Sequence, residues 1–254
     1  MPGTEAREIR VLDTPDALAE TAASTIVETA CEAVAARGRF TVALAGGATP
    51  RASYARLAVA PHAGRMPWPH TFVFFGDDRG VPPDHPESNY RMAHETLLAK
   101  VPIPTAQVFR IRAEAEDPEA AAAEYARTLA DVFAIRRGEQ PRFDLVLLGL
   151  GIDGHTASLF PGSPALKEVF RAVAAVHVAA AIVPQRFTLT FPILNAAARV
   201  VFLVAGPEKA KIVRAALGKQ GVSLPAGMVR PVDGRLTWLL DRDAAALLPV
   251  ADAR

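Results

Sequence analysis

Short apolar runs alternate along this chain with alanine-rich stretches, and no other feature of the sequence limits the possible folds as much. Runs of β-forming residues occur at 40–45, 71–75 and 143–148, and helix-forming segments separate them. Strands that are apolar almost throughout are buried on both faces, as in a parallel sheet that helices cover. The sequence therefore predicts an α/β fold with a mainly parallel sheet and helices on both of its faces.

Local signals place the other elements. Thr14 can cap a helix, and Gly38 is typical of the end of that helix. Thr49 predicts in the same way the start of a helix over 51–60. Further helices are expected from Ser88, over 117–137 and over 207–217, and further strands at 172–178, 187–190, 199–205 and 236–240. The chain has no internal repeat and no flexible linker, which predicts one domain over residues 1–254.

The composition excludes several classes of protein. The 254 residues carry a formal net charge of +1, without a basic patch that would bind nucleic acid. The longest apolar run, 172–184, is shorter than the roughly 18 residues of a membrane span, and charges stand where a signal peptide would be apolar. The single cysteine, Cys31, fits a reducing compartment and is expected in the core. These features predict a cytoplasmic protein that binds neither nucleic acid nor membrane.

Three unusual loops, at 46–50, 76–90 and 149–162, each follow a predicted strand directly. If these strands are parallel, their carboxyl ends meet at one edge of the sheet, and so do the loops. Ligands of open α/β sheets bind beyond the carboxyl ends of the strands. The three loops are therefore expected to form one binding site.

The first two loops carry groups that suit a phosphorylated ligand with many hydroxyls. Gly46 and Gly47 would let a phosphate approach backbone N–H groups at a helix start, although the same residues also suit an ordinary tight turn. Asp77 and Asp78 could accept hydrogen bonds from hydroxyls, and Arg79 could pair with a phosphate or carboxylate. The alternative for this second loop is a solvated charged turn.

The third loop contains the pattern G-x-G-x-x-G and, within it, Asp153 followed closely by His155. The glycine pattern alone does not predict a nicotinamide cofactor, because no acidic residue ends the next strand, where a ribose would be bound. A neutral histidine beside a carboxylate can take a proton from water near neutral pH. His155 is therefore a candidate base, the alternative being a histidine that satisfies a loop hydrogen bond.

Other mechanisms are disfavoured because their motifs are missing. The chain has no G-x-S-x-G elbow of a serine hydrolase and no P-loop for a nucleotide. Its histidines and acidic residues do not show the spacing of metal ligands. The sequence predicts neither a metal nor a cofactor.

Together the loops resemble the 6-phosphogluconolactonase family. The similar segments stand in the family's order: AGGATP at 45–50, GDDRGVPPDHPESNY at 76–90, DLVLLGLGIDGHTASLFPG at 144–162, RFTLTFPILNAA at 186–197 and GPEKA at 206–210. The resemblance implies a Rossmann-like fold shared with glucosamine-6-phosphate deaminases and ribose-5-phosphate isomerases. It also implies hydrolysis of 6-phospho-D-glucono-1,5-lactone to 6-phospho-D-gluconate, the second step of the oxidative pentose phosphate pathway.

The resemblance also implies roles for single residues. His155 would activate water against the lactone carbonyl, and Asp153 would orient the base or the substrate. Contacts to the substrate are expected from the following residues: Gly46, Gly47, Thr49, Asp77, Asp78, Arg79, Arg186 and Lys209. The expected partner is a phosphorylated sugar lactone, and the chain is expected to be a monomer or a small homo-oligomer.

Two other functions stay open at this point. One is a glucosamine-6-phosphate deaminase or isomerase, a family with an Asn-Glu-Pro run after its D-G-H segment. This chain has Ser158-Leu159-Phe160 there, and Arg79 stands where that family has a tyrosine, which favours the lactonase. The other is a sugar-phosphate-binding protein without catalysis, against which the presence of both His155 and Asp153 speaks.

Overall fold

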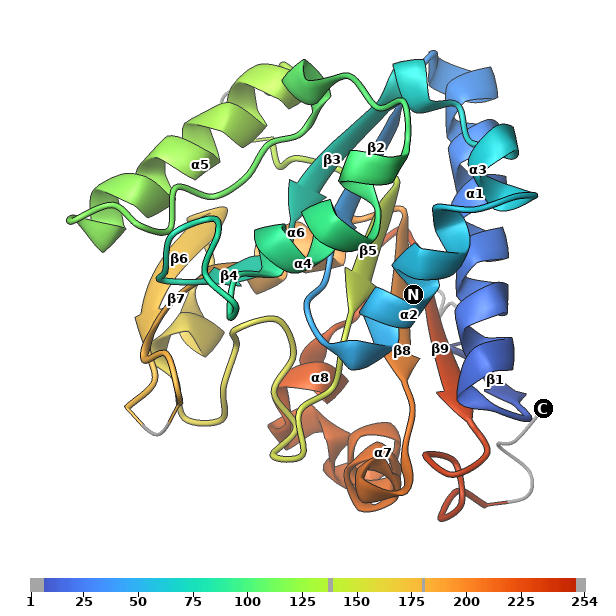
Figure 1. Ribbon diagram of the computed structural model, residues 1–254. Helices are drawn as coiled ribbons and strands as arrows, with labels where there is room; N and C mark the ends of the chain where they lie inside the picture. The colour runs from blue at the N-terminus through green and yellow to red at the C-terminus, as the bar shows by residue number, and fades with distance from the viewer. Residues whose placement is uncertain (1–6, 137–138, 180, 250–254) are drawn as a thin grey trace.

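The computed structural model describes residues 7–136, 139–179 and 181–249, and it contains two sheets (Figure 1). The larger sheet consists of β1 (Glu8–Leu12), β2 (Phe40–Leu44), β3 (Thr71–Phe75), β5 (Leu145–Leu148), β8 (Arg199–Val204) and β9 (Arg235–Asp241). The smaller sheet consists of β4 (Asp77–Arg79), β6 (Val173–His177) and β7 (Gln185–Leu189). The α-helices are α1 (Pro15–Arg37), α2 (Ala48–Leu57), α3 (His62–Arg65), α4 (Asn89–Thr96), α5 (Pro118–Phe133), α6 (Phe191–Ala196), α7 (Ala210–Leu217) and α8 (Pro225–Met228).

The larger sheet is parallel throughout, with the strand order β1-β9-β8-β5-β2-β3. Every residue of β2 and of β5 is buried, which is why both strands form continuous apolar runs in the sequence. The strands predicted at 40–45, 71–75, 143–148, 199–205 and 236–240 all belong to this sheet. The predicted α/β fold with a mainly parallel sheet is confirmed.

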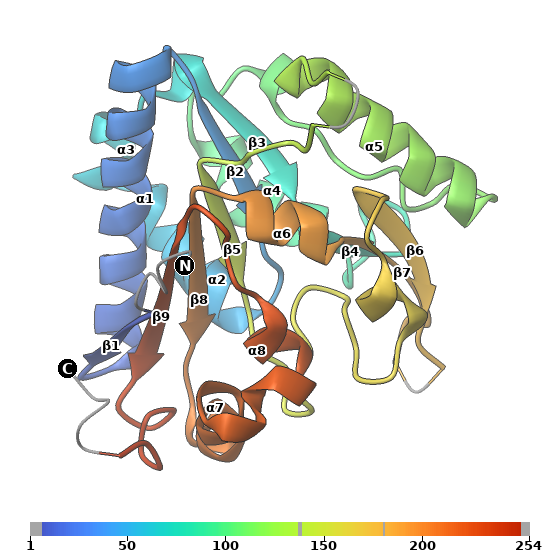
Figure 2. The same ribbon diagram turned by 180° about the vertical axis from the view of Figure 1, so that it is seen from behind.

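Helices cover both faces of the sheet, as predicted. Helix α1 packs beside α2. Helices α2 and α4 lie in front of the sheet in Figure 1. Helices α6 and α8 lie on the opposite face, which is in front in Figure 2. Helix α1 begins and ends as its sequence predicts. The Thr14 hydroxyl accepts a hydrogen bond from the Ala17 N–H, and Gly38 closes the helix at a φ of +74°.

None of the helices in the described residues has the length and apolar character needed to cross a membrane.

Two predicted strands do not join the parallel sheet. The runs at 172–178 and 187–190 form β6 and β7, which pair antiparallel with each other, and β7 also pairs antiparallel with β4. The connection between β6 and β7 is only a few residues long, and a parallel pair would need a crossover of a dozen residues or more. The chain therefore reverses there and builds a second, smaller sheet beside the end of β3 (Figure 1).

Helix boundaries differ from the prediction at both ends of α2, which ends at Leu57 and not at residue 60, and at the end of α5. Helix α2 begins at Ala48 with Gly47 as its N-cap, so Thr49 lies inside the first turn and is not the cap. Helix α5 ends at Phe133, where the next residue takes the left-handed conformation and its N–H closes the last turn. The end expected for this helix, residue 137, lies outside the described residues.

Strands β1 and β4 were not predicted, because neither is an apolar run. Strand β1 is an edge strand with exposed and half-buried side chains, and β4 has only three residues, all charged. The expectation that Cys31 lies in the core is wrong, since its side chain is exposed on α1. Its Sγ atom lies 3.6 Å from the carbonyl oxygen of Arg65.

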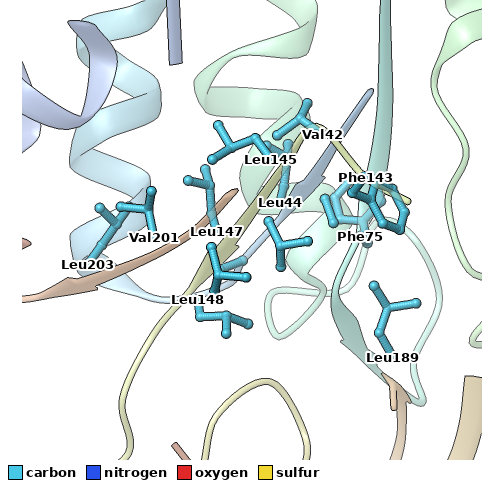
Figure 3. Close-up of a cluster of buried hydrophobic side chains, with 14 of the residues drawn as sticks. Val42, Leu44, Phe75, Phe143, Leu145, Leu147, Leu148, Leu189, Val201 and Leu203 are labelled. Carbon is cyan, nitrogen blue, oxygen red and sulfur yellow. The ribbon is translucent and has the colours of Figure 1, made fainter. Parts of the chain in front are cut away.

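The core lies along the larger sheet, where side chains from β2, β3, β5 and β8 pack against one another (Figure 3). Val42, Leu44, Leu147 and Val201 are among these side chains, and each is at most 3% exposed. Full burial of such a side chain contributes roughly 1.5–3 kcal/mol to the stability of the fold. This packing fixes the carboxyl ends of the four strands relative to one another, and with them the loops that follow.

Candidate active site

A cleft of about 330 Å³ lies beyond the carboxyl ends of β2, β3, β5 and β8. The three loops singled out in the sequence meet there, together with the loop after β8 and the start of β7. The predicted site residues on its wall are Gly46, Gly47, Thr49, Asp77, Arg79, His155, Arg186 and Lys209. The two other predicted residues, Asp78 and Asp153, do not line the cleft.

The loop after β2 presents backbone N–H groups to the cleft. Gly47 is the N-cap of α2 with a φ of +105°, a conformation that favours glycine. Because glycine has no side chain, the N-cap supplies no hydroxyl or carboxylate to occupy the first N–H groups of the helix. The Tyr54 hydroxyl fixes the loop, since it donates to the Ala45 carbonyl and accepts from the Ala45 N–H, each at 2.9 Å. The helix start can therefore bind an anion without moving.

His155 and Asp153 form a hydrogen-bonded pair. The Nδ1 atom of His155 lies 2.6 Å from Oδ1 of Asp153, and the backbone N–H of His155 donates to the same oxygen at 3.1 Å. Partial burial acts to raise the pKa of the Asp153 carboxyl, but the hydrogen bonds from His155 and the electrostatic attraction between the two side chains outweigh it and hold that pKa below its usual value. An ionised carboxylate only accepts hydrogen bonds, so Nδ1 carries the proton and Nε2 is left as the basic atom.

Gly151 provides the room for this pair. A Cβ atom at this position would lie 2.0 Å from Nδ1 of His155 and 2.6 Å from Oδ1 of Asp153. A side chain at Gly151 would therefore displace the imidazole from its carboxylate. Gly151 belongs to the G-x-G-x-x-G pattern of the sequence, but here its missing side chain leaves space for the hydrogen-bonded imidazole.

An aromatic ring packs against the face of the imidazole. Phe160 stacks on His155 with the ring centroids 4.1 Å apart and the planes inclined by 24°. The guanidinium carbon of Arg186 lies 5.6 Å from the centroid of the same Phe160 ring. Phe160 thus touches both the basic residue and a cation of the cleft, and such ring contacts are attractive as well as apolar.

Two arginines of the smaller sheet lie opposite each other on neighbouring strands, and both line the cleft. Arg79 on β4 pairs with Arg186 on β7 in the antiparallel register. Burial lowers the pKa of Arg186, and the neighbouring charge of Arg79 lowers it further. Like charges placed directly across a strand pair are destabilising. The pair therefore favours an anion, and in the described residues the buried Nε atom of Arg79 has no hydrogen-bond partner.

Asp77 is a buried carboxylate on the wall of the cleft. Its Oδ2 atom accepts from the Ser158 hydroxyl at 2.8 Å, and its Oδ1 atom accepts from the Asn89 side-chain amide at 3.2 Å. The same amide donates to the Asp77 carbonyl at 2.9 Å. These bonds fix the carboxylate, which has further lone pairs for a hydroxyl of a ligand.

Asp78 points away from the cleft and anchors the start of α4. Its carboxylate accepts from the backbone N–H groups of Arg79, Asn89 and Tyr90 at 2.7–3.2 Å, and from the Ser88 hydroxyl at 3.3 Å. The side chain is only 2% exposed. The geometry therefore gives Asp78 a structural role and does not place it for the expected contact with substrate.

The buried position of Asp78 has a measurable consequence. Burial raises the pKa of its carboxyl to about 6, against the lowering effect of its backbone hydrogen bonds. Because this folded-state pKa lies above that of the unfolded chain, Asp78 contributes less stability as the pH rises from about 4 to about 6. We expect Asp78→Asn to destabilise the fold more at pH 4.5 than at pH 7, by about 2 kcal/mol. Urea unfolding at the two pH values measures this difference, and an equal loss at both would contradict it.

Comparison with known proteins places the chain in a family. A model of the family described as glucosamine-6-phosphate isomerases/6-phosphogluconolactonase matches residues 13–238. The chain belongs to this family. Its similarity is not confined to the loops, because the matched segment runs from before α1 into β9.

Curated relatives resemble the chain over nearly its full length. The 6-phosphogluconolactonase of Rattus norvegicus is 42% identical over 250 residues, covering 95% of this chain and 94% of the relative. The 6-phosphogluconolactonase of Synechocystis sp. is 41% identical over 241 residues, covering 94% and 97%.

Solved structures of the family agree with the fold. The 6-phosphogluconolactonase from Trypanosoma brucei is similar with a TM-score of 0.83 and 32% identity, covering 96% of this chain and 99% of that one. A structure described as a monomeric glucosamine-6-phosphate deaminase has a TM-score of 0.76 at 22% identity. This second likeness shows a shared fold and no more.

The structure adds residues of the cleft that sequence reasoning did not single out. Asn89, Glu208 and Ala157 line the cleft, and Ser158 and Phe160 fix residues that do. Asn89 and Ser158 stand inside the motifs quoted for the resemblance, but their spacing in sequence from Asp77 gives no sign of contact. Within the described ranges, no three side chains of His, Cys, Asp or Glu gather as a metal site would require.

Proposed function

We propose that this chain hydrolyses 6-phospho-D-glucono-1,5-lactone to 6-phospho-D-gluconate in the oxidative pentose phosphate pathway. The observation that carries the proposal is the hydrogen-bonded pair His155–Asp153, with His155 on the wall of a cleft that also offers helix-start N–H groups and cations. The names of curated relatives at about 40% identity support the same substrate.

His155 acts in this proposal as a general base. While Nδ1 donates to Asp153, Nε2 takes a proton from a water molecule whose oxygen attacks the lactone carbonyl carbon. The charge that develops on the carbonyl oxygen is stabilised by the guanidinium of Arg79, which follows the acidic pair on β4 and lines the cleft. When the tetrahedral intermediate collapses, the bond to the ring oxygen breaks and this oxygen takes the proton back from the imidazolium. No covalent enzyme intermediate is needed.

The phosphate of the substrate binds in the same cleft. The N–H groups at Gly46 and Gly47, with the Thr49 hydroxyl, receive its oxygens at the start of α2. Arg186 and Lys209 add charge-assisted hydrogen bonds. Asp77 accepts from a sugar hydroxyl, which orients the ring so that its carbonyl faces His155. Each of these residues lines the cleft, which supports the assignment.

A direct assay tests the proposal. Purified protein should hydrolyse the phosphorylated lactone well above the spontaneous rate, and treatment with EDTA should leave this activity unchanged. Absence of lactone hydrolysis, with ammonia released from glucosamine 6-phosphate, would favour the deaminase instead. Binding of 6-phosphogluconate without turnover of either substrate would favour a sugar-phosphate-binding protein. Loss of activity with EDTA, restored by zinc or magnesium, would contradict the expectation of a metal-free site.

We also propose a single domain, a cytoplasmic location, and a monomer or small homo-oligomer for this chain. One cluster of buried hydrophobic residues joins the elements from α1 to β9, which supports a single domain. The exposed single thiol of Cys31 supports the cytoplasm as the compartment, which cell fractionation would test. Sedimentation would distinguish a monomer from a small homo-oligomer.

A further inference from the structure

A buried carboxylate outside the cleft holds the loop that carries Lys209. Asp241 is the last residue of β9 and is 1% exposed. Both of its carboxylate oxygens lie 3.1 Å from the backbone nitrogen of Gly206, and Oδ1 also accepts from the Ala244 N–H at 2.8 Å. A buried carboxylate must keep its hydrogen bonds, because an unpaired one is very costly. Asp241 therefore determines where Gly206 lies.

Gly206 begins the short turn that brings two side chains to the cleft. It has a φ of +106°, and its carbonyl accepts from the Lys209 N–H at 3.1 Å. A Cβ atom at Gly206 would lie 2.5 Å from a carboxylate oxygen of Glu208. The turn is thus closed over only four residues, and a shift of Gly206 moves the Cα atom of Lys209 with it.

Asp241 acts on this turn from outside the site. Strand β9 lies on one side of β8, and the other cleft-forming strands β5, β2 and β3 lie on its opposite side (Figure 2). Asp241 is not among the residues that line the cleft. The segment matched by the family model ends at residue 238, so Asp241 lies beyond it. The hydrogen bond to Gly206 is the side-chain contact of Asp241 that leads to the loop of the cleft.

We propose that Asp241 is a positioning residue, which fixes Lys209 for binding of the phosphate group. The proposal rests on the proposed function, in which Lys209 contacts that phosphate. The backbone position of Lys209 sets how many rotamers of its long side chain bring the ammonium group to a fixed anion, and therefore how much conformational entropy binding costs. The carboxylate of Asp241 supplies this fixed place, because it binds the residue at which the turn begins.

The variant Asp241→Asn tests the proposal in the full chain. Asparagine keeps the shape of the side chain, but with its oxygen at the Oδ1 position its amide NH2 takes the place of Oδ2 and faces the Gly206 N–H, donor against donor. We expect KM for the phosphorylated lactone to rise by about 5- to 20-fold with a smaller change in kcat, and KM for unphosphorylated gluconolactone to stay within about twofold. An unchanged KM for the phosphorylated lactone would overturn the proposal.

Two further variants separate positioning from general stability. In a Lys209→Ala background, Asp241→Asn should raise KM no further, because the side chain it positions is already gone. The control is Asp144→Asn, which changes another buried carboxylate, bonded to the Thr41 N–H and hydroxyl at the amino end of β5. This control should lower the melting temperature and leave KM unchanged. Full additivity of Asp241→Asn and Lys209→Ala would overturn the proposal.

Gly206→Ala disturbs the same turn if Asp241→Asn does not fold. We expect it to raise KM for the phosphorylated lactone in the same way, and a folded Gly206→Ala protein with normal KM would overturn the proposal. Calorimetric titration with inorganic phosphate gives a readout that does not need turnover. If the chain proves not to be a lactonase, weaker phosphate binding by Asp241→Asn and Lys209→Ala alike would still support the role of Asp241, and unchanged binding by Asp241→Asn would overturn it.

Discussion

Replacement of His155 with alanine is expected to lower kcat for the phosphorylated lactone by about 100- to 10,000-fold, the range typical of a lost general base. The imidazole is only half-buried, and the turn that carries it is closed by backbone bonds, among them the Gly151 N–H to the carbonyl of residue 155 at 2.8 Å. The fold should therefore persist. Initial rates, corrected for spontaneous hydrolysis, together with a circular dichroism spectrum, measure the effect.

His177 provides a matched control for this prediction. It is an exposed histidine on β6, outside the cleft, and His177→Ala should keep normal activity. Asp153→Asn should give an intermediate loss, because asparagine no longer fixes the proton on Nδ1 of His155. A folded His155→Ala protein with near-normal turnover would show that another group activates the water.

Truncation of Lys209 or Arg186 to alanine is expected to weaken binding of the phosphorylated lactone by about 10- to 100-fold. Each residue would supply a charge-assisted hydrogen bond to the phosphate, and such a bond contributes roughly 1.5–3 kcal/mol. Some loss of kcat should accompany the loss of binding, because phosphate contacts also orient the reacting carbonyl. Steady-state kinetics with the phosphorylated and the unphosphorylated lactone measure both effects.

The unphosphorylated lactone is the decisive comparison, since it lacks the group that these cations would bind. Lys211→Ala is a suitable control, because Lys211 is an exposed lysine two residues along the chain that does not line the cleft. It should leave both substrates unaffected. If Lys209→Ala and Arg186→Ala slow both lactones equally, the phosphate binds elsewhere.

Much of the fold followed from local signals. The buried strands β2 and β5 are apolar throughout, and a run of that kind has few alternatives to a covered parallel sheet. The boundaries of α1 followed from a capping threonine and a terminal glycine. The place of the cleft followed from the parallel order of the strands, which brings their carboxyl ends to one edge.

The smaller sheet could not be derived in this way. Strand β4 consists of three charged residues, which in isolation indicate a solvated turn. It becomes a strand because β7 offers it a partner from more than a hundred residues further along the chain. Its register with β7 is also what sets Arg79 opposite Arg186, a contact that no local pattern indicates.

Asp77 and Asp78 show where the sequence by itself reaches its limit. The sequence determined that two carboxylates stand at the carboxyl end of β3, beside loops rich in glycine and cations. Which of the two faces the cleft depends on the long-range pairing of β4. Pairing with β7 makes the segment a strand, and successive side chains of a strand point to opposite sides. Asp77 and Arg79 therefore line the cleft, while Asp78 turns inward to the first N–H groups of α4.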